Sequence, residues 1–176
     1  MKKKTLSLQT HLWTRSCYSS SYELISQMFD IAHLDYYKKE VLNYFHFAFQ
    51  NEAYKEERVS EVIFNSYVLF SVFRACYNIY VRPNGFEKRN LLHEEVEERD
   101  YYLSSLSREE FINPYLAIKS IYDIVEIEEL EGTFSEIVRA TLLDSLEDVY
   151  TDERSVQIMT YFKLLDACWL INERMK

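Results

Sequence analysis

Glycine and proline are nearly absent from this chain. Its 176 residues include two glycines, Gly85 and Gly132, and two prolines, Pro83 and Pro114, whereas average usage would give about twenty such residues. Tight hairpins and phosphate-binding loops need glycine at positive φ. The scarcity therefore disfavours a β-sheet protein or a glycine-rich nucleotide loop, and it favours long helices joined by short polar links.

The signatures of several large enzyme classes are also missing. Two glycines so placed cannot supply G-x-x-x-x-G-K, G-x-G-x-x-G or G-x-S-x-G, which mark P-loop, Rossmann and nucleophile-elbow proteins. The chain has no H-E-x-x-H zinc motif and no C-x-x-C pair. These absences exclude the P-loop enzymes, the Rossmann enzymes and the elbow-type hydrolases, and they favour binding over catalysis.

The three cysteines, Cys17, Cys76 and Cys168, lie far apart in the sequence. An odd number of cysteines with no disulfide framework is typical of a reducing compartment. Cys76 and Cys168 fall in apolar helical runs, where a thiol acts as a small hydrophobe. The basic N-terminus is not followed by the apolar stretch of a signal peptide. We therefore expect a cytoplasmic protein whose residues 1–18 form a basic tail or an irregular segment.

Apolar residues recur at intervals of three and four over most of the chain, which is the periodicity of α-helices. We predict a single all-α domain over residues 1–176, built as a compact bundle of about seven helices. Two long apolar helices, at about 57–81 and 152–174, are expected to form its centre, because helices that are apolar nearly all round are buried on most sides.

The first of these helices carries an apolar run of membrane-spanning length, Val62–Val81. Asn65, Arg74 and Asn78 interrupt the run, and an arginine near the centre of a membrane costs about 3 kcal/mol. We therefore expect a buried central helix and no association with a membrane. Buried charge is costly unless it is paired, so Arg74 is expected to meet a carboxylate such as that of Asp166.

Capping residues predict where several helices begin and end. Ser107 and Glu110 have the spacing of a capping box, and Asn113 followed by Pro114 predicts the start of the next helix. The other expected boundaries are a cap at Asp35, a turn at residues 82–85, a left-handed helix end at Gly132, a second capping box of Thr133 and Glu136, and a cap at Thr151.

Charge is distributed unevenly along the chain. The net charge is −9 overall and −11 over residues 87–148. An acidic surface repels phosphate backbones, which disfavours nucleic-acid binding, and it attracts a basic protein partner; the alternative is a solvated face that provides only solubility. Fifteen tyrosines add a residue type that is enriched at protein interfaces. The residues expected to bind a partner are Glu94, Glu95, Glu97, Glu98, Tyr101 and Tyr102.

The same acidic segment contains a pattern typical of metal-binding carboxylates. Glu94, Glu95 and Glu98 form E-E-x-x-E, and Asp123 and Glu126 follow as D-x-x-E. Carboxylates at this spacing share a helix face, and two such faces could hold Mg²⁺ between them. The pattern resembles that of the MazG-like all-α nucleoside triphosphate pyrophosphohydrolases, in which E-E-x-x-E is followed by E-x-x-D, although the second pair is reversed here and a proline interrupts the intervening region. The resemblance implies a Mg²⁺-dependent nucleotide hydrolase as the alternative function.

A second alternative rests on Arg89 and His93. The HEPN-type ribonucleases, another all-helical class, carry an Arg-x(4–6)-His motif, which this pair resembles with three residues between its members. Side chains at i and i+4 of a helix can meet, and the resemblance implies RNA cleavage by a dimer. With no strong catalytic motif present, we favour a non-enzymatic adaptor, inhibitor or assembly subunit that needs no cofactor and can self-associate.

Overall fold

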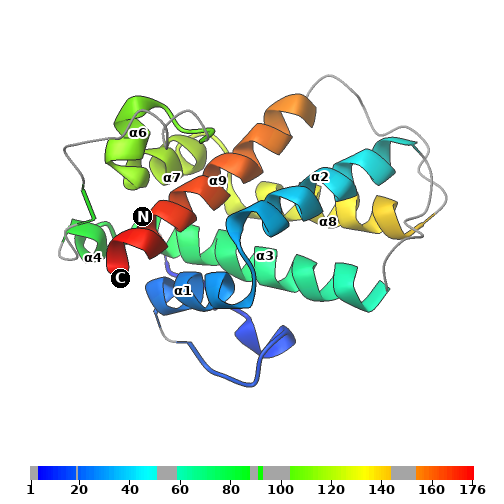
Figure 1. Ribbon diagram of the computed structural model, residues 1–176, viewed down its shortest axis with the longest axis horizontal. Coiled ribbons are helices and arrows are strands. Elements are labelled where there is room, and N and C mark those ends of the chain that lie inside the picture. Colours follow the sequence, from blue (N-terminus) through cyan, green and yellow to red (C-terminus); the bar gives the residue numbers. More distant parts are fainter. Residues whose placement is uncertain (1–3, 19, 51–58, 88–90, 93–103, 144–153) are drawn as a thin grey trace.

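The computed structural model of this chain describes residues 4–18, 20–50, 59–87, 91–92, 104–143 and 154–176 (Figure 1). These residues contain eight α-helices and no strand, which confirms the predicted all-α bundle. The helices are α1 Ser21–Ile31, α2 Leu34–Gln50, α3 Val59–Val81, α4 Asn84–Glu87, α6 Arg108–Ile112, α7 Pro114–Tyr122, α8 Ile127–Leu142 and α9 Arg154–Met175, preceded by a 3₁₀ turn, η1, at Thr10–Leu12.

The two long helices α3 and α9 form the centre of the bundle (Figure 1). α3 packs against α1, α7 and α8, and α9 packs against α1, α2 and α7. Wherever the apolar runs at about 57–81 and 152–174 fall on described residues, they form these helices, as predicted. The shorter helices therefore cover this central pair from several sides.

Much of α3 is enclosed by the other helices. Val62, Leu69, Phe73 and Cys76 have no exposed surface, and 56% of the helix's most apolar 18-residue window is buried inside the bundle. By length and composition alone, this helix could cross a membrane. In this structure it is instead packed inside the bundle, as expected for a central helix whose apolar run is interrupted by Asn65, Arg74 and Asn78.

Three aromatic rings from three helices meet in the core. The ring centroids of Phe73 on α3, Phe134 on α8 and Tyr161 on α9 lie 5.2 to 5.3 Å apart, a separation at which tilted and edge-to-face pairs are favourable. All three side chains are buried. Because such rings remove large apolar areas from water, this cluster is a main contributor to the packing of α3, α8 and α9.

Buried tyrosines also link helices through their hydroxyl groups. The Tyr37 hydroxyl donates to the carbonyl of Met28 at 2.9 Å, the Tyr122 hydroxyl to that of Phe73 at 2.7 Å, and the Tyr161 hydroxyl to that of Leu130 at 3.1 Å. Burial raises the pKa of each of these tyrosines above its ordinary value of 10.0. Part of the high tyrosine content therefore serves the core.

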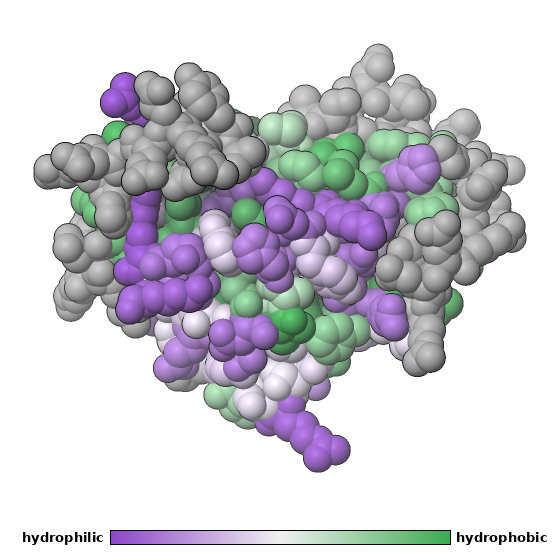
Figure 2. Space-filling model, viewed as in Figure 1, coloured by the Kyte–Doolittle hydropathy of each residue, from purple (hydrophilic) through white to green (hydrophobic). Residues whose placement is uncertain are grey.

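The surface formed by α9 and α2 is mixed in character (Figure 2). Hydrophilic side chains cover its middle, and an apolar patch lies where these two helices run side by side. Large exposed apolar side chains on the two helices include Leu42, Phe49 and Met159. Single exposed apolar side chains are normal on protein surfaces, so the patch does not by itself mark a binding site.

Two of the predicted helix starts are confirmed. Ser107 accepts a hydrogen bond from the N–H of Glu110, and the Glu110 carboxylate accepts one from the N–H of Ser107, which completes the capping box of α6. Asn113 caps α7 by accepting from the N–H of Tyr115, and Pro114 occupies the first turn of that helix. These features depend only on neighbouring residues.

Three predicted boundaries are wrong. α2 begins at Leu34, so Asp35 lies in its first turn instead of capping it. Gly132 and Thr133 lie inside α8, where they form neither a left-handed helix end nor a capping box. The apolar stripe of α8 continues through Gly132, and its burial outweighs the cost of about 1 kcal/mol of a glycine in a helix. The predicted cap at Thr151 lies outside the described residues.

Candidate functional site

Most residues of the predicted sites lie outside the described part of the chain. They are Glu94, Glu95, Glu97, Glu98, Tyr101 and Tyr102, together with Arg89 and His93. The acidic binding surface, the magnesium site and the ribonuclease pair therefore stay predictions.

Asp123 and Glu126, the described part of the predicted magnesium site, fall on either side of a turn. Asp123 is the C-cap residue of α7 and Glu126 is the N-cap residue of α8. The expectation that they share one helix face is wrong, because the chain leaves the helix between them. Asp123 Oδ2 contacts Lys119 Nζ, and Oδ1 accepts a hydrogen bond from Tyr80 at 2.9 Å. Over the described ranges, no group of three or more His, Cys, Asp or Glu side chains could hold a metal ion.

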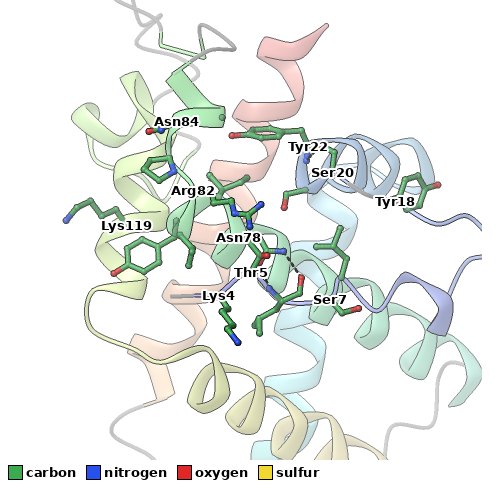
Figure 3. A pocket seen from close by; sticks show the side chains of 18 of the residues that line it. Lys4, Thr5, Ser7, Tyr18, Ser20, Tyr22, Asn78, Arg82, Asn84 and Lys119 are labelled. Atoms are coloured by element: carbon green, nitrogen blue, oxygen red, sulfur yellow. Dashed lines mark hydrogen bonds between the residues drawn. The ribbon is translucent and has the colours of Figure 1, made fainter. Parts of the chain in front are cut away.

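A groove of about 1710 Å³ opens between the N-terminal segment, the start of α1 and the corner that joins α3 to α4 (Figure 3). Four segments that are distant in sequence build it. They are residues 4–8, residues 18–22 without 19, residues 78–85, and Lys119 with Asp123 from the end of α7. We take this groove as the candidate functional site.

Asn78 of α3 fixes the N-terminal wall of the groove. The N–H of Leu6 donates to Asn78 Oδ1 at 2.7 Å, and Asn78 Nδ2 donates to the carbonyl of Leu6 at 2.9 Å (dashed in Figure 3). Further along the same segment, Trp13 Nε1 donates to Ser71 Oγ at 2.8 Å. Residues 4–18 therefore form an irregular segment that is fastened along α3.

Arg74 lies one turn before Asn78 and supports the same wall. It forms a bidentate ion pair with Glu131 of α8, at 2.5 Å for Nε to Oε1 and 2.8 Å for Nη2 to Oε2, and Nη1 donates to the carbonyl of Ser7 at 3.3 Å. A carboxylate partner was expected for Arg74, but its predicted identity, Asp166, is wrong. α8 packs against α3 beside Arg74, and the Asp166 carboxylate binds other groups.

Two cations of the groove have no acidic partner among the described side chains. Arg82 is exposed where α3 ends, and Figure 3 shows it among the lining residues; Lys4 is exposed on the N-terminal wall. Lys119 differs because its ammonium donates to Asp123, a contact that raises the pKa of Lys119. The charge left for a ligand is therefore positive, in a chain whose net charge is −9.

The groove combines this charge with aromatic and apolar surface. Tyr18, Tyr22 and Tyr80 line it, together with aliphatic side chains such as Ile79 and Val81. Tyrosines supply contact area and a polar tip at a small cost in conformational entropy, which is why binding surfaces are rich in them. The lining is thus suited to a ligand that is partly apolar and carries negative charge.

A second set of charges lies inside the bundle and fastens the chain around α6. Asp166 on α9 accepts from the N–H and Oγ of Ser105, at 2.7 and 2.6 Å, and pairs with Lys38 of α2 at 2.5 Å. One turn away on α9, Lys163 pairs with Glu110 of α6 at 2.5 Å. Asp166 is 3% exposed and Glu110 is 8% exposed. Because each carboxylate has its cation, we interpret this set as structural.

The environment of Glu110 changes its acidity. Burial alone would raise the pKa of this carboxyl group, but hydrogen bonds from Lys163 and from the N–H of Ser107 stabilise the carboxylate. The hydrogen bonds outweigh the burial, and the pKa of Glu110 lies below its ordinary value of 4.5. Glu110 therefore both caps α6 and ties that helix to α9.

Sequence reasoning missed the groove. It noted Arg82 only as part of a turn and Lys4 only as part of a basic terminus, because neither residue belongs to a motif. The signal that could have indicated this place is Asn78, since an amide in an otherwise apolar central helix needs a hydrogen-bonding partner. What the sequence could not supply is the identity of that partner, 72 residues away.

Comparisons with known protein families, with curated proteins and with solved structures found no match to this chain.

Proposed function

We propose that this chain is a non-enzymatic protein-interaction module whose groove binds an extended, acidic segment of a partner protein. The observation that supports the proposal best is the position of Arg82 and Lys4, which have no acidic partner among the described residues and line a groove rich in tyrosine. A carboxylate of the partner would accept charge-assisted hydrogen bonds from Arg82, which are stronger than bonds between neutral groups.

The size of the groove favours a polypeptide over a small molecule. Small-molecule pockets have volumes of roughly 300–1,000 Å³, whereas this groove measures about 1710 Å³. An extended segment can place side chains against the tyrosines while a carboxylate reaches Arg82. The missing enzyme signatures agree with a binding role, and the proposed activity needs no cofactor.

The acidic, tyrosine-rich segment is a second surface in the same proposal. Glu94, Glu95, Glu97 and Glu98, with Tyr101 and Tyr102, would attract a basic region of the partner and speed the encounter. Changing the four glutamates to lysine should weaken the complex in low salt and have a smaller effect in high salt, where surface charges are screened. We also propose that the protein acts in the cytoplasm.

A peptide library tests the groove directly. Random 12-residue peptides would be selected for binding to the wild-type protein. We expect the selected peptides to share carboxylate side chains, and we expect Arg82→Glu to lower their affinity at least about tenfold, the loss of one charge-assisted contact. The matched control is Arg139→Glu, since Arg139 is exposed on α8 and does not line the groove.

Two results would contradict the proposal. Selected peptides without carboxylates would show that Arg82 and Lys4 do not choose the ligand. Equal loss of affinity in the Arg82→Glu and Arg139→Glu variants would show that only net charge matters. A rise in melting temperature with Mg²⁺ that is lost on changing Glu95 to Gln would instead support the hydrolase alternative.

A further inference from the structure

Two thiols meet in the centre of the bundle. Cys76 on α3 and Cys168 on α9 are separated by 92 residues in sequence, and their Sγ atoms lie 3.2 Å apart. Both side chains have no exposed surface, and both cysteines are free. A disulfide bond is about 2.05 Å long, so the two sulfur atoms would need to approach by only about 1.2 Å.

We propose that Cys76 and Cys168 form an intramolecular disulfide when the protein meets a peroxide or a small-molecule disulfide, and that this bond fastens α3 to α9. With hydrogen peroxide, the S–S bond forms and the O–O bond breaks. Two electrons pass from the sulfur atoms to the peroxide, and the two thiol hydrogens leave in two molecules of water. With oxidised glutathione, two successive exchanges release two molecules of the glutathione thiol.

The fold favours this bond because it has already brought the sulfur atoms together. In the unfolded chain, forming the same bond requires closure of a long loop, with a large loss of conformational entropy. In the folded chain, both cysteines are held on long helices that pack in the same core. The disulfide should therefore be more stable in the folded protein than in the unfolded chain.

The surroundings of the pair decide how fast it reacts. The hydrogen bond with Cys76 and burial raise the pKa of the Cys168 thiol, so neither change favours the reactive thiolate. Tyr122 of α7 is a neighbouring neutral group of both thiols, and Tyr122 in turn lies near Tyr161 of α9 and Glu131 of α8. Oxidation should therefore be slow, and the bond, once formed, should be shielded from reductants.

The proposal concerns the core and is independent of the groove. Neither cysteine lines the groove, so peptide binding and disulfide formation can each fail without the other. Cys17 is exposed and could form mixed disulfides, so the test uses the Cys17→Ser variant. This surface change leaves both core thiols in place, and the main measurement requires no substitution in the core.

The experiment compares the folded and the denatured Cys17→Ser protein in glutathione redox buffers, approached from both the reduced and the oxidised side. The fraction of disulfide is read from thiol counts after quenching and from the loss of about 2 Da that a disulfide causes. The measured quantity is the buffer ratio, the squared concentration of reduced glutathione divided by the concentration of oxidised glutathione, at which half of the protein carries the disulfide. We expect this ratio to be about a hundredfold higher for the folded protein than for the denatured chain. The oxidised form should also melt at a higher temperature than the reduced form.

The Cys17→Ser/Cys76→Ala and Cys17→Ser/Cys168→Ala variants are the controls, since each has one thiol, cannot form the intramolecular bond and should not show the loss of about 2 Da in the same buffers. The proposal would be overturned if the folded protein kept both thiols in buffers that oxidise the denatured chain. Equal disulfide stability in the two states, or a lower melting temperature of the oxidised form, would overturn it equally.

Discussion

α3 and α9 are both central and nearly equal in length, at 23 and 22 residues, yet they hold the rest of the chain by different chemistry. α3 binds its neighbours mainly through amides. Asn78 holds Leu6, and Asn65 donates to Tyr36 Oη at 2.7 Å and to Glu40 Oε2 at 3.2 Å. Its one described ion pair joins Arg74 to Glu131 of α8, and the same guanidinium donates one hydrogen bond to the carbonyl of Ser7 in the N-terminal segment.

α9 holds the chain through three charged residues along its length. Lys163 and Asp166 bind the region of α6, and Arg174 donates to three carbonyls near the end of that helix. The acceptors are Leu91 at 2.8 Å, Phe111 at 2.5 Å and Ile112 at 3.0 Å. Burial lowers the pKa of Arg174. Polar residues on apolar central helices therefore decide which peripheral segment docks where. Removing one partner of a buried ion pair leaves an unpaired charge, which costs more free energy than an unpaired amide.

The largest effect is expected when Asp166 is changed to Ala. Lys38 would lose its carboxylate, and the N–H and hydroxyl of Ser105 would lose their acceptor, so the free energy of unfolding should fall by about 3–5 kcal/mol in urea denaturation. Asp123→Ala is the matched control, because that carboxylate is exposed at a helix end, and it should change stability little. Similar losses of stability in both variants would show that the buried carboxylate contributes no more than the exposed one.

Glu110→Gln isolates the ion pair between α6 and α9, because glutamine can keep the capping box but cannot pair with Lys163. At neutral pH, the free energy of unfolding should fall by about 1.5–3 kcal/mol, the range for hydrogen bonds to charged groups. The pKa of Glu110 is lower in the folded state than in the unfolded chain, so below pH 4.5 the unfolded chain binds more protons. The wild type should therefore lose more stability with acid than Glu110→Gln, and the two curves should converge.

The control for this pH dependence is Glu109→Gln, which changes the exposed neighbouring residue. Its stability should run parallel to that of the wild type from neutral to acid pH. If the Glu110→Gln curve were parallel instead, the ion pair with Lys163 would not contribute to the acid sensitivity.

A smaller effect is expected on the α3 side. Asn78→Leu removes two hydrogen bonds with the backbone of Leu6, and stability should fall by about 1–2 kcal/mol, at about 1 kcal/mol for each bond. Backbone amide exchange at Leu6 should become faster, because its N–H would lose its acceptor. Ser7→Ala, in the same segment, should alter neither quantity appreciably. A loss as large as that of Asp166→Ala would show that the amide contacts of α3 and the charged contacts of α9 contribute equally to stability.

Gly132→Ala changes neither central helix and provides the smallest expected effect, with the opposite sign. A Cβ atom at Gly132 would meet no atom within 4 Å, and φ at this position is not positive. Alanine should therefore stabilise α8 by about 0.5–1 kcal/mol, measured as a higher melting temperature. Gly85→Ala should gain less, because α4 is short and the new Cβ would lie 3.6 Å from Tyr22. Destabilisation by Gly132→Ala would mean that the helix needs glycine there.

The sequence predicts those features of the fold that depend on neighbouring residues. The two central helices follow from long apolar runs, and the cap at Ser107 follows from a glutamate three residues later. Gly132 misleads because a glycine is tolerated in a helix when the buried stripe around it continues. The partner of Arg74 could not be predicted, since several carboxylates were equally plausible until the packing of α8 against α3 was known.

The groove was unpredictable for the same reason. Asn78 indicated that something must bind the central helix, but nothing in the local pattern identified Leu6. Arg82 lies in a sequence typical of a turn, and its place beside residues 4–8 is a property of the tertiary fold alone. Cys76 and Cys168 were recognised as core residues, whereas their contact requires the relative register of α3 and α9.

The bonds from tyrosine hydroxyls to helix carbonyls have a consequence for behaviour in alkali. Because the pKa of Tyr37, Tyr122 and Tyr161 is higher in the folded protein than in the unfolded chain, their contribution to stability is complete below pH 10 and disappears as the pH rises further. A spectrophotometric titration should therefore show two classes of phenol. Exposed rings should ionise gradually. The buried tyrosines should develop phenolate absorbance in a single cooperative step, together with loss of the helical circular dichroism signal.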